Sequence, residues 1–73
     1  MVATEEIRRL VAEHVEPPAD DEAELQLPSL ALVIVAEELE RRHGFLVAAR
    51  ELLPENFGSV ARIARFVQRR AAR

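Results

Sequence analysis

The sequence contains no cysteine, no tryptophan and no tyrosine, and it has only two glycines. The absence of cysteine excludes disulfides, thiolate nucleophiles and zinc sites with cysteine ligands. Because its only glycines are Gly44 and Gly58, the chain has no glycine-rich loop that could cradle a phosphate. We therefore expect its stability to come from packing alone, and any phosphate that it handles to be covalently attached.

Long hydrophobic runs are also missing. No apolar stretch approaches the ~20 residues needed to cross a bilayer, and the first six residues lack the basic and apolar regions of a secretory signal. We expect a soluble, cytoplasmic protein that does not bind membranes. A chain of 73 residues corresponds to one domain, residues 1–73, and such a domain buries only roughly 60% of its unfolded surface. This size favours a monomeric carrier, adaptor or binding module over an enzyme.

The net charge of −3 is distributed unevenly along the chain. A mildly acidic chain with few aromatic residues and no central basic stripe lacks the charge that nucleic-acid binding requires, so we expect no nucleic-acid partner. A DNA-binding or dimerisation module that uses the C-terminal arginines is kept as an alternative hypothesis. The acidic cluster comprises Asp20, Asp21, Glu22 and Glu24, and the C-terminal arginines are Arg62, Arg65, Arg69, Arg70 and Arg73.

Helical periodicity predicts a first helix from about Thr4 to Glu16, ended by the pair Pro17-Pro18. Its buried stripe is expected to contain Ile7, Leu10, Val11 and His14. The acidic connection that follows, residues 17–27, is long for a small helical domain. We expect its apolar residues, Leu25 and Leu27, to fold under the loop; the alternative is a solvated linker.

A second helix is predicted from about Pro28 or Ser29 to His43, with Gly44 in the left-handed position that follows a helix. Steps of about 100° per residue place one set of side chains on the core face. This set comprises Leu32, Val35, Ala36, Leu39 and His43. The other side holds Leu30, Ile34, Glu37 and Arg41, with Val33 and Glu40 at the border. Its exposed aliphatic residues suggest a partner, although scattered surface leucine and isoleucine are common.

The last third of the chain predicts shorter elements before a final helix. Phe45-Leu46-Val47 is expected to re-enter the core, and residues 48–53 and 54–57 are expected to form short helical turns. Ser59 is a plausible N-cap for a last helix that ends near Arg70. Its stripe is Val60, Ile63, Ala64 and Val67. The predicted fold is an all-α bundle of three main helices plus a short third helix.

Candidate chemistry is confined to Ser29, a hydroxyl at the start of the second helix. A phosphodiester there would be stabilised by about 0.3–1 kcal/mol through the helix dipole, but a serine at this place can also simply cap the helix. His14 and His43 belong to different helices and have no partner at metal-ligand or catalytic spacing. We therefore expect no catalytic residue and no metal site.

Taken together, these residues resemble the acyl carrier protein family, including its peptidyl and aminoacyl carriers. The resemblance covers most of the chain and rests on the Leu-x-Leu-x-Ser-Leu entry into the second helix, with Ser29-Leu30 fifteen residues before Gly44. Leu39-Glu40 before the glycine and the closing segment of residues 54–60, Pro-Glu-Asn-Phe-Gly-Ser-Val, also look like this family.

The resemblance implies a non-catalytic, four-helix carrier. A phosphopantetheinyl transferase would use coenzyme A to attach 4'-phosphopantetheine to Ser29, and the thiol of this arm would hold an acyl or aminoacyl thioester. The partners implied are this transferase, a loading ligase, and the synthases or transferases of fatty acid, polyketide or nonribosomal peptide biosynthesis. The residues expected to contact them are Leu30, Val33, Ile34, Glu37 and Glu40.

Some positions differ from the usual pattern of this family. Pro28 stands where the family usually has aspartate, and Gln26 stands where it often has glycine. Arg41 and Arg42 also replace what is often an acidic stretch. The sequence is therefore compatible with a second hypothesis, in which a carrier-like domain is not modified and serves only in protein interactions.

Overall fold

The computed structural model describes residues 3–72, which form an all-helical bundle. Its elements are α1 (Thr4–Ala12), α2 (Ser29–His43), the 3-10 turn η1 (Ala49–Glu51), α3 (Pro54–Phe57) and α4 (Val60–Ala71). The predicted all-α architecture, with three longer helices and a short third one, is confirmed. Within residues 3–72, no helix is both long enough and apolar enough to cross a membrane.

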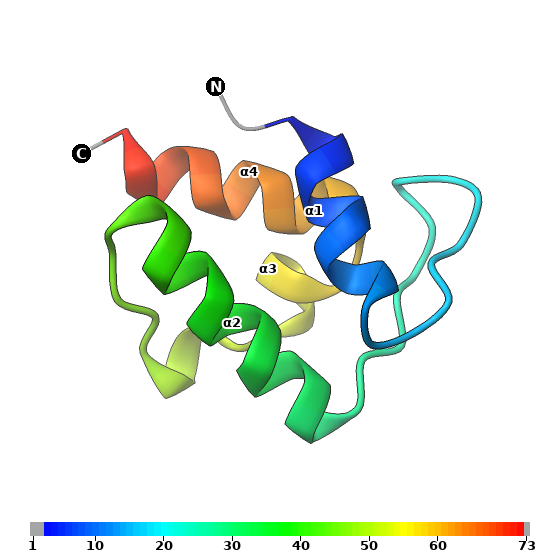
Figure 1. The fold of residues 1–73 in the computed structure, drawn as a ribbon, viewed down its shortest axis with the longest axis horizontal. Helices are drawn as coiled ribbons and strands as arrows, with labels where there is room; N and C mark the ends of the chain where they lie inside the picture. The colour runs from blue at the N-terminus through cyan, green and yellow to red at the C-terminus, as the bar shows by residue number, and fades with distance from the viewer. Residues whose placement is uncertain (1–2, 73) are drawn as a thin grey trace.

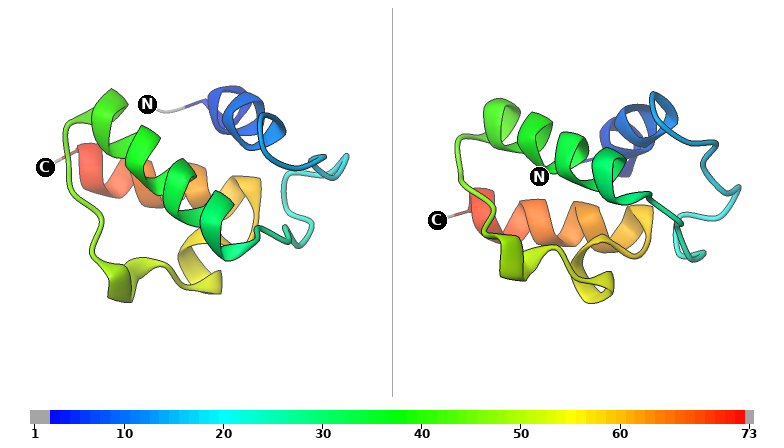
Figure 2. Two further views of the ribbon diagram at one scale, coloured as in Figure 1. Left: turned by 60° about the horizontal axis from the view of Figure 1, so that its bottom comes forward. Right: turned by 90° about the horizontal axis from the view of Figure 1, so that it is seen from below.

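Helix α4 is the central element of the core. It lies between α1 on one side and α3 on the other, with α2 packed across it (Figures 1 and 2). Because it is covered from several directions, Ala61 and Phe66 are buried in addition to its predicted stripe. The core combines aliphatic residues from all three longer helices with Leu25 and Phe57. The buried members from α1 and α2 are Ile7, Leu10, Val11, Val35, Ala36 and Leu39.

Helix α1 is shorter than predicted. It ends at Ala12 and not near Glu16, and the chain then tightens through hydrogen bonds from the Glu13 N–H to the Leu10 carbonyl and from the His14 N–H to the Val11 carbonyl. These three-residue bonds are typical of a final 3-10 turn. The Pro17-Pro18 pair therefore lies beyond the end of the helix, and His14 lies half-buried in the turn.

Helix α2 has the predicted bounds. It begins at Ser29 and ends at His43, and Gly44 adopts a φ of 76°, the left-handed conformation that glycine adopts with least strain. The predicted core face is confirmed in its centre, where Val35, Ala36 and Leu39 are buried. At its two ends, Leu32 and His43 are half-buried.

The connection from α2 to α4 differs from prediction at one residue. Phe45 and Val47 pack against the core, but Leu46 between them is 77% exposed. In an extended segment successive side chains point to opposite sides, so only two of the three can face inwards. The short turns were predicted correctly, and the Ser59 hydroxyl accepts a hydrogen bond from the Arg62 N–H at 3.0 Å as the N-cap of α4.

Candidate functional site

Ser29 is the first residue of α2 and is exposed to solvent. Pro28 occupies the N-cap position, and no side chain caps this helix. The alternative in which Ser29 caps the helix is therefore wrong, because its hydroxyl lies one position too late. The first turn also has no acidic residue, so no side chain of this turn supplies a carboxylate to the N–H groups at this helix end.

Substitution of Pro28 tests whether α2 lacks a cap. Pro28 has φ −58° and ψ 155°, an extended conformation that an aspartate cap can adopt. We expect Pro28→Asp to be more stable than Pro28→Ala by about 0.5–2 kcal/mol, because only aspartate supplies an acceptor for the free N–H groups. Both variants lose the rigidity of proline to the same extent. The difference between their free energies of unfolding in urea therefore measures the contribution of the cap. Equal stabilities would contradict an uncapped helix.

The acidic loop before Ser29 is attached to the bundle at several points. The Leu25 N–H donates to the Gly58 carbonyl at 2.8 Å, and the Ala61 N–H donates to the Asp21 carbonyl at 2.9 Å. Asp21 also pairs with Arg8 of α1 at 3.2 Å. Leu25 is buried and Leu27 packs partly on the core, as predicted. The loop is therefore not a free linker, and it holds the start of α2 in place.

The outer face of α2 carries the residues predicted to contact partners. Leu30 is 73% exposed, and Val33, Ile34 and Glu37 are exposed on the same helix. Glu40 is placed differently: it is half-buried, and its carboxylate accepts the Val47 N–H at 2.7 Å. The structure therefore groups Ser29 with the apolar N-terminal half of α2, whereas Glu40 supports the connection behind this helix.

An open groove of about 500 Å³ lies close to the start of α2. Its walls come from the acidic loop, from α2, from the segment that contains η1 and α3, and from the first turn of α4. Both apolar and charged side chains contribute. Among the lining residues are Leu27, Leu32, Leu52, Leu53, Phe57 and Arg62.

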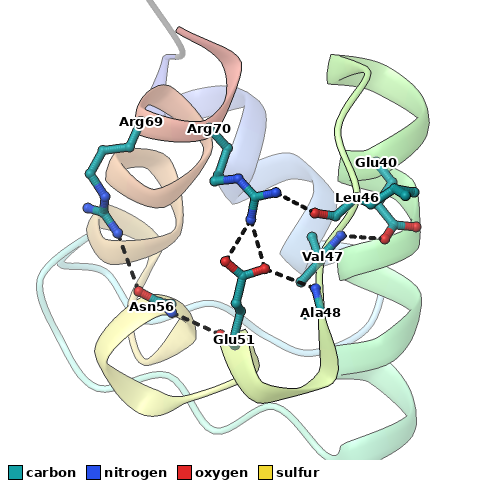
Figure 3. Close-up of polar contacts among 8 residues, drawn as sticks. All are labelled: Glu40, Leu46, Val47, Ala48, Glu51, Asn56, Arg69 and Arg70. Atoms are coloured by element: carbon teal, nitrogen blue, oxygen red, sulfur yellow. Dashed lines mark hydrogen bonds and ion pairs between the residues drawn. The ribbon is translucent and has the colours of Figure 1, made fainter. Parts of the chain in front are cut away.

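A polar cluster fixes the connection between α2 and α3 (Figure 3). One terminal nitrogen of Arg70 lies 2.7 Å from both carboxylate oxygens of Glu51, and the other donates to the Leu46 carbonyl at 2.7 Å. The Ala48 N–H donates to Glu51 at 2.9 Å. The pKa of Glu51 is lowered by this backbone hydrogen bond and by Arg70. Because the shift is downward, these contacts stabilise the fold above the ordinary pKa of glutamate and are lost as the pH falls through the lowered value.

A second polar cluster joins the end of α2 to the start of α1. The Nε2 atom of His43 lies 3.1 Å from the Glu6 carboxylate, and Arg42 reaches the same carboxylate at 3.6 Å. Glu38 pairs with Arg42 and with Arg41, and these hydrogen bonds lower the pKa of Glu38. His43 therefore has a structural role between two helices.

Within residues 3–72, Thr4 and Ser29 are both exposed hydroxyls at the start of a helix, but the first turn of α1 carries Glu5 and Glu6 whereas that of α2 carries no acidic residue. Ser29 also has the apolar outer face of α2 beside it and an open groove nearby. Residues 3–72 include no group of three or more histidine, aspartate or glutamate side chains placed to hold a metal ion. No model of a protein family, no curated protein and no solved structure matches this chain. The arrangement is suited to carrying a group attached to Ser29 and to presenting it together with the outer face of α2.

Two features of this region have no signal in the local sequence pattern. Nothing in the surroundings of Arg70 along the chain indicates Glu51 as its partner. Glu40 was placed on the border of a partner-binding face because it follows the periodicity of α2. Both contacts depend on how the connection after Gly44 folds back, which local spacing does not encode.

Proposed function

We propose that this protein is a carrier that holds an acyl or aminoacyl group as a thioester on a 4'-phosphopantetheine arm attached to Ser29. The observation that carries the proposal is an exposed serine hydroxyl at the first position of an uncapped helix. The resemblance of the surrounding motif and of the four-helix order to acyl carrier proteins supports the same conclusion.

The chemistry of the chain is consistent with this proposal. A phosphodiester on Ser29 would lie at the positive end of the α2 dipole, where no aspartate or glutamate competes in the first turn. The chain contains no cysteine, so the thiol for thioester formation would come from the cofactor. The protein itself would then catalyse nothing, and the transfer chemistry would belong to its partner enzymes.

The outer face of α2 is the proposed docking surface for these enzymes. Leu30, Val33 and Ile34 supply exposed apolar area next to Ser29, as the centre of an interface requires. Glu37 adds a charge that can guide the approach of a partner. The enzymes concerned are a phosphopantetheinyl transferase, a loading ligase, and a synthase or acyltransferase that receives the cargo.

A second candidate function is that of a protein-interaction domain with a carrier-like fold and no modification. Pro28 favours this alternative, because a transferase that recognises the usual aspartate finds no carboxylate at this position. The exposed Leu30 and Ile34 would serve either function.

The experiment that tests the proposal is the intact mass of the protein after incubation with coenzyme A and a broad-specificity phosphopantetheinyl transferase. We expect wild type to gain one phosphopantetheine and Ser29→Ala to gain none. Ser59→Ala is the matched control, because Ser59 is the only other serine in the chain and is buried at the start of α4. It should be modified as wild type is.

The mass of the protein purified from its native host separates the two candidate functions. A species with the arm on Ser29 supports the carrier and excludes the unmodified domain. If the native protein is entirely unmodified and the transferase also adds nothing to the wild type, the carrier proposal fails. Modification that persists in Ser29→Ala would show that the attachment site has been misassigned.

A further inference from the structure

One wall of the groove is attached to the bundle by an apolar contact at one end and by polar contacts at the other. It is the segment Ala49–Phe57, which contains η1 and α3 and supplies Leu52, Leu53 and Phe57 to the groove. Of these three side chains only Phe57 is buried, against Phe66 of α4 with ring centroids 5.2 Å apart. Leu52 is half-buried and Leu53 is exposed. The apolar anchor of this wall is therefore at its C-terminal end.

The N-terminal end of the wall is held by polar contacts that meet at Glu51 (Figure 3). The Glu51 carboxylate binds Arg70 of α4 and the Ala48 N–H, and its backbone carbonyl accepts the Asn56 side-chain amide at 2.9 Å. The other charged group near this carboxylate is Arg50, on the same turn. Glu51 thus joins the N-terminal part of the wall, Ala49–Leu53, to the last helix. The C-terminal part has its own polar contacts with α4, from Arg69 to the Asn56 side chain at 3.4 Å and from Arg62 to the Pro54 carbonyl at 3.0 Å.

Arg70 is held in place independently of Glu51. Its guanidinium donates to the Leu46 carbonyl and lies over the rings of Phe45 and Phe66, at 5.5 and 5.7 Å from their centroids. Removing the Glu51 carboxylate would therefore leave the cation in position on α4. What would be lost is the attachment of Ala49–Leu53, whereas Pro54–Phe57 would keep its own contacts with α4.

From this arrangement we infer that the N-terminal part of the wall, Ala49–Leu53, is latched, and that release of the contact between Glu51 and Arg70 lets the groove widen there while the three longer helices stay folded. A part-buried ion pair contributes far less than a buried apolar cluster. Opening at the latch therefore requires less free energy than unfolding of the core, which is the condition for a local opening. This device goes beyond the proposed carrier function and does not depend on modification of Ser29.

Amide hydrogen exchange of the unmodified protein tests the latch. In Glu51→Ala we expect exchange of the Leu52 and Leu53 amides, which bond to the Ala49 and Glu51 carbonyls, to be faster by about tenfold or more. The amides of the α4 core should be unchanged, because only this part of the wall opens. Arg70→Lys keeps the charge but cannot reach Glu51 and the Leu46 carbonyl together, so it should show a smaller change at the same amides. Glu38→Ala is the control, since it breaks ion pairs on α2 that do not touch the wall.

Thiol labelling measures the widening itself. Because the chain has no cysteine, Leu52→Cys introduces a single thiol on the wall of the groove. Its reaction with a maleimide should be faster when Glu51→Ala is added, and unchanged when Glu38→Ala is added. The inference is overturned if wall exchange and labelling stay at the wild-type rate, or if every helix exchanges faster by the same factor.

Discussion

Gly58→Ala is expected to destabilise the protein strongly, although it adds only one methyl group. A Cβ atom at Gly58 would lie 2.3 Å from the Pro54 carbonyl oxygen, a distance that real Cβ atoms essentially never show, and 3.1 Å from the carbonyl carbon, which is tighter than most real Cβ contacts. The Pro54 oxygen cannot move freely, because it accepts hydrogen bonds from the Gly58 N–H at 2.8 Å and from the Arg62 side chain at 3.0 Å. The backbone at the junction of α3 and α4 would have to shift.

This junction also supports the candidate site. The Gly58 carbonyl accepts the Leu25 N–H, so a displaced Gly58 would loosen the acidic loop that leads to Ser29. We expect a loss of at least ~1–3 kcal/mol, the usual cost of overpacking a site that is already full. Urea unfolding followed by circular dichroism measures it, since α1, α2 and α4 provide most of the helical signal.

Gly44→Ala is the matched control, because its destabilisation would come from backbone strain and not from a close contact. Gly44 has a positive φ of 76°, and a Cβ atom there would meet nothing within 4 Å. Gly44→Ala should therefore cost only the conformational strain of a left-handed alanine, about 1–2 kcal/mol. A Gly58→Ala protein as stable as wild type would show that the junction relaxes without loss and that the close contact at Pro54 is not limiting.

Leu39→Ala is expected to have the second large effect. Leu39 is fully buried and holds α2 against the core together with Val35 and Ala36. Truncation of such a leucine leaves a cavity and costs about 2–5 kcal/mol. Small domains have only about 5–15 kcal/mol of stability in total, so a large part of the population could unfold at physiological temperature. The free energy of unfolding in urea measures the effect.

Leu30→Ala is the control on the same helix. Leu30 is 73% exposed, so we expect its substitution to change the free energy of unfolding by less than about 0.5 kcal/mol. If the proposed carrier function is right, Leu30→Ala should nevertheless slow the addition of phosphopantetheine to Ser29, because the transferase loses an apolar contact. A modification rate equal to that of wild type would show that Leu30 is not part of the docking surface for the transferase.

Much of the fold follows from local patterns. The hydrophobic period of α2, the proline before it and Gly44 after it predicted its bounds, because each signal acts within a few residues. Ser59 was identified as a cap from its position before an apolar stripe, and the structure places its hydroxyl on the Arg62 N–H. The exposed position of Leu30 also follows from helical periodicity alone.

Features that depend on contacts distant in sequence were not predicted. The exposed Leu46 reflects which neighbours of the segment after Gly44 reach the core. Phe66 is buried because α4 is surrounded by other helices, which a single-helix pattern does not reveal. In each case the deciding neighbour belongs to another element.

The features of the candidate site also fall into two groups, those set by local sequence and those set by tertiary packing. The sequence alone determined that Ser29 stands at the start of an amphipathic helix behind an acidic loop, because helix signals and periodicity are local properties of the chain. Only the tertiary structure decided that Pro28, not Ser29, takes the cap position, that Glu40 is drawn to the Val47 N–H, and that Glu51 meets Arg70. These outcomes depend on backbone geometry and on packing across the bundle, where residues separated along the sequence compete for the same partners.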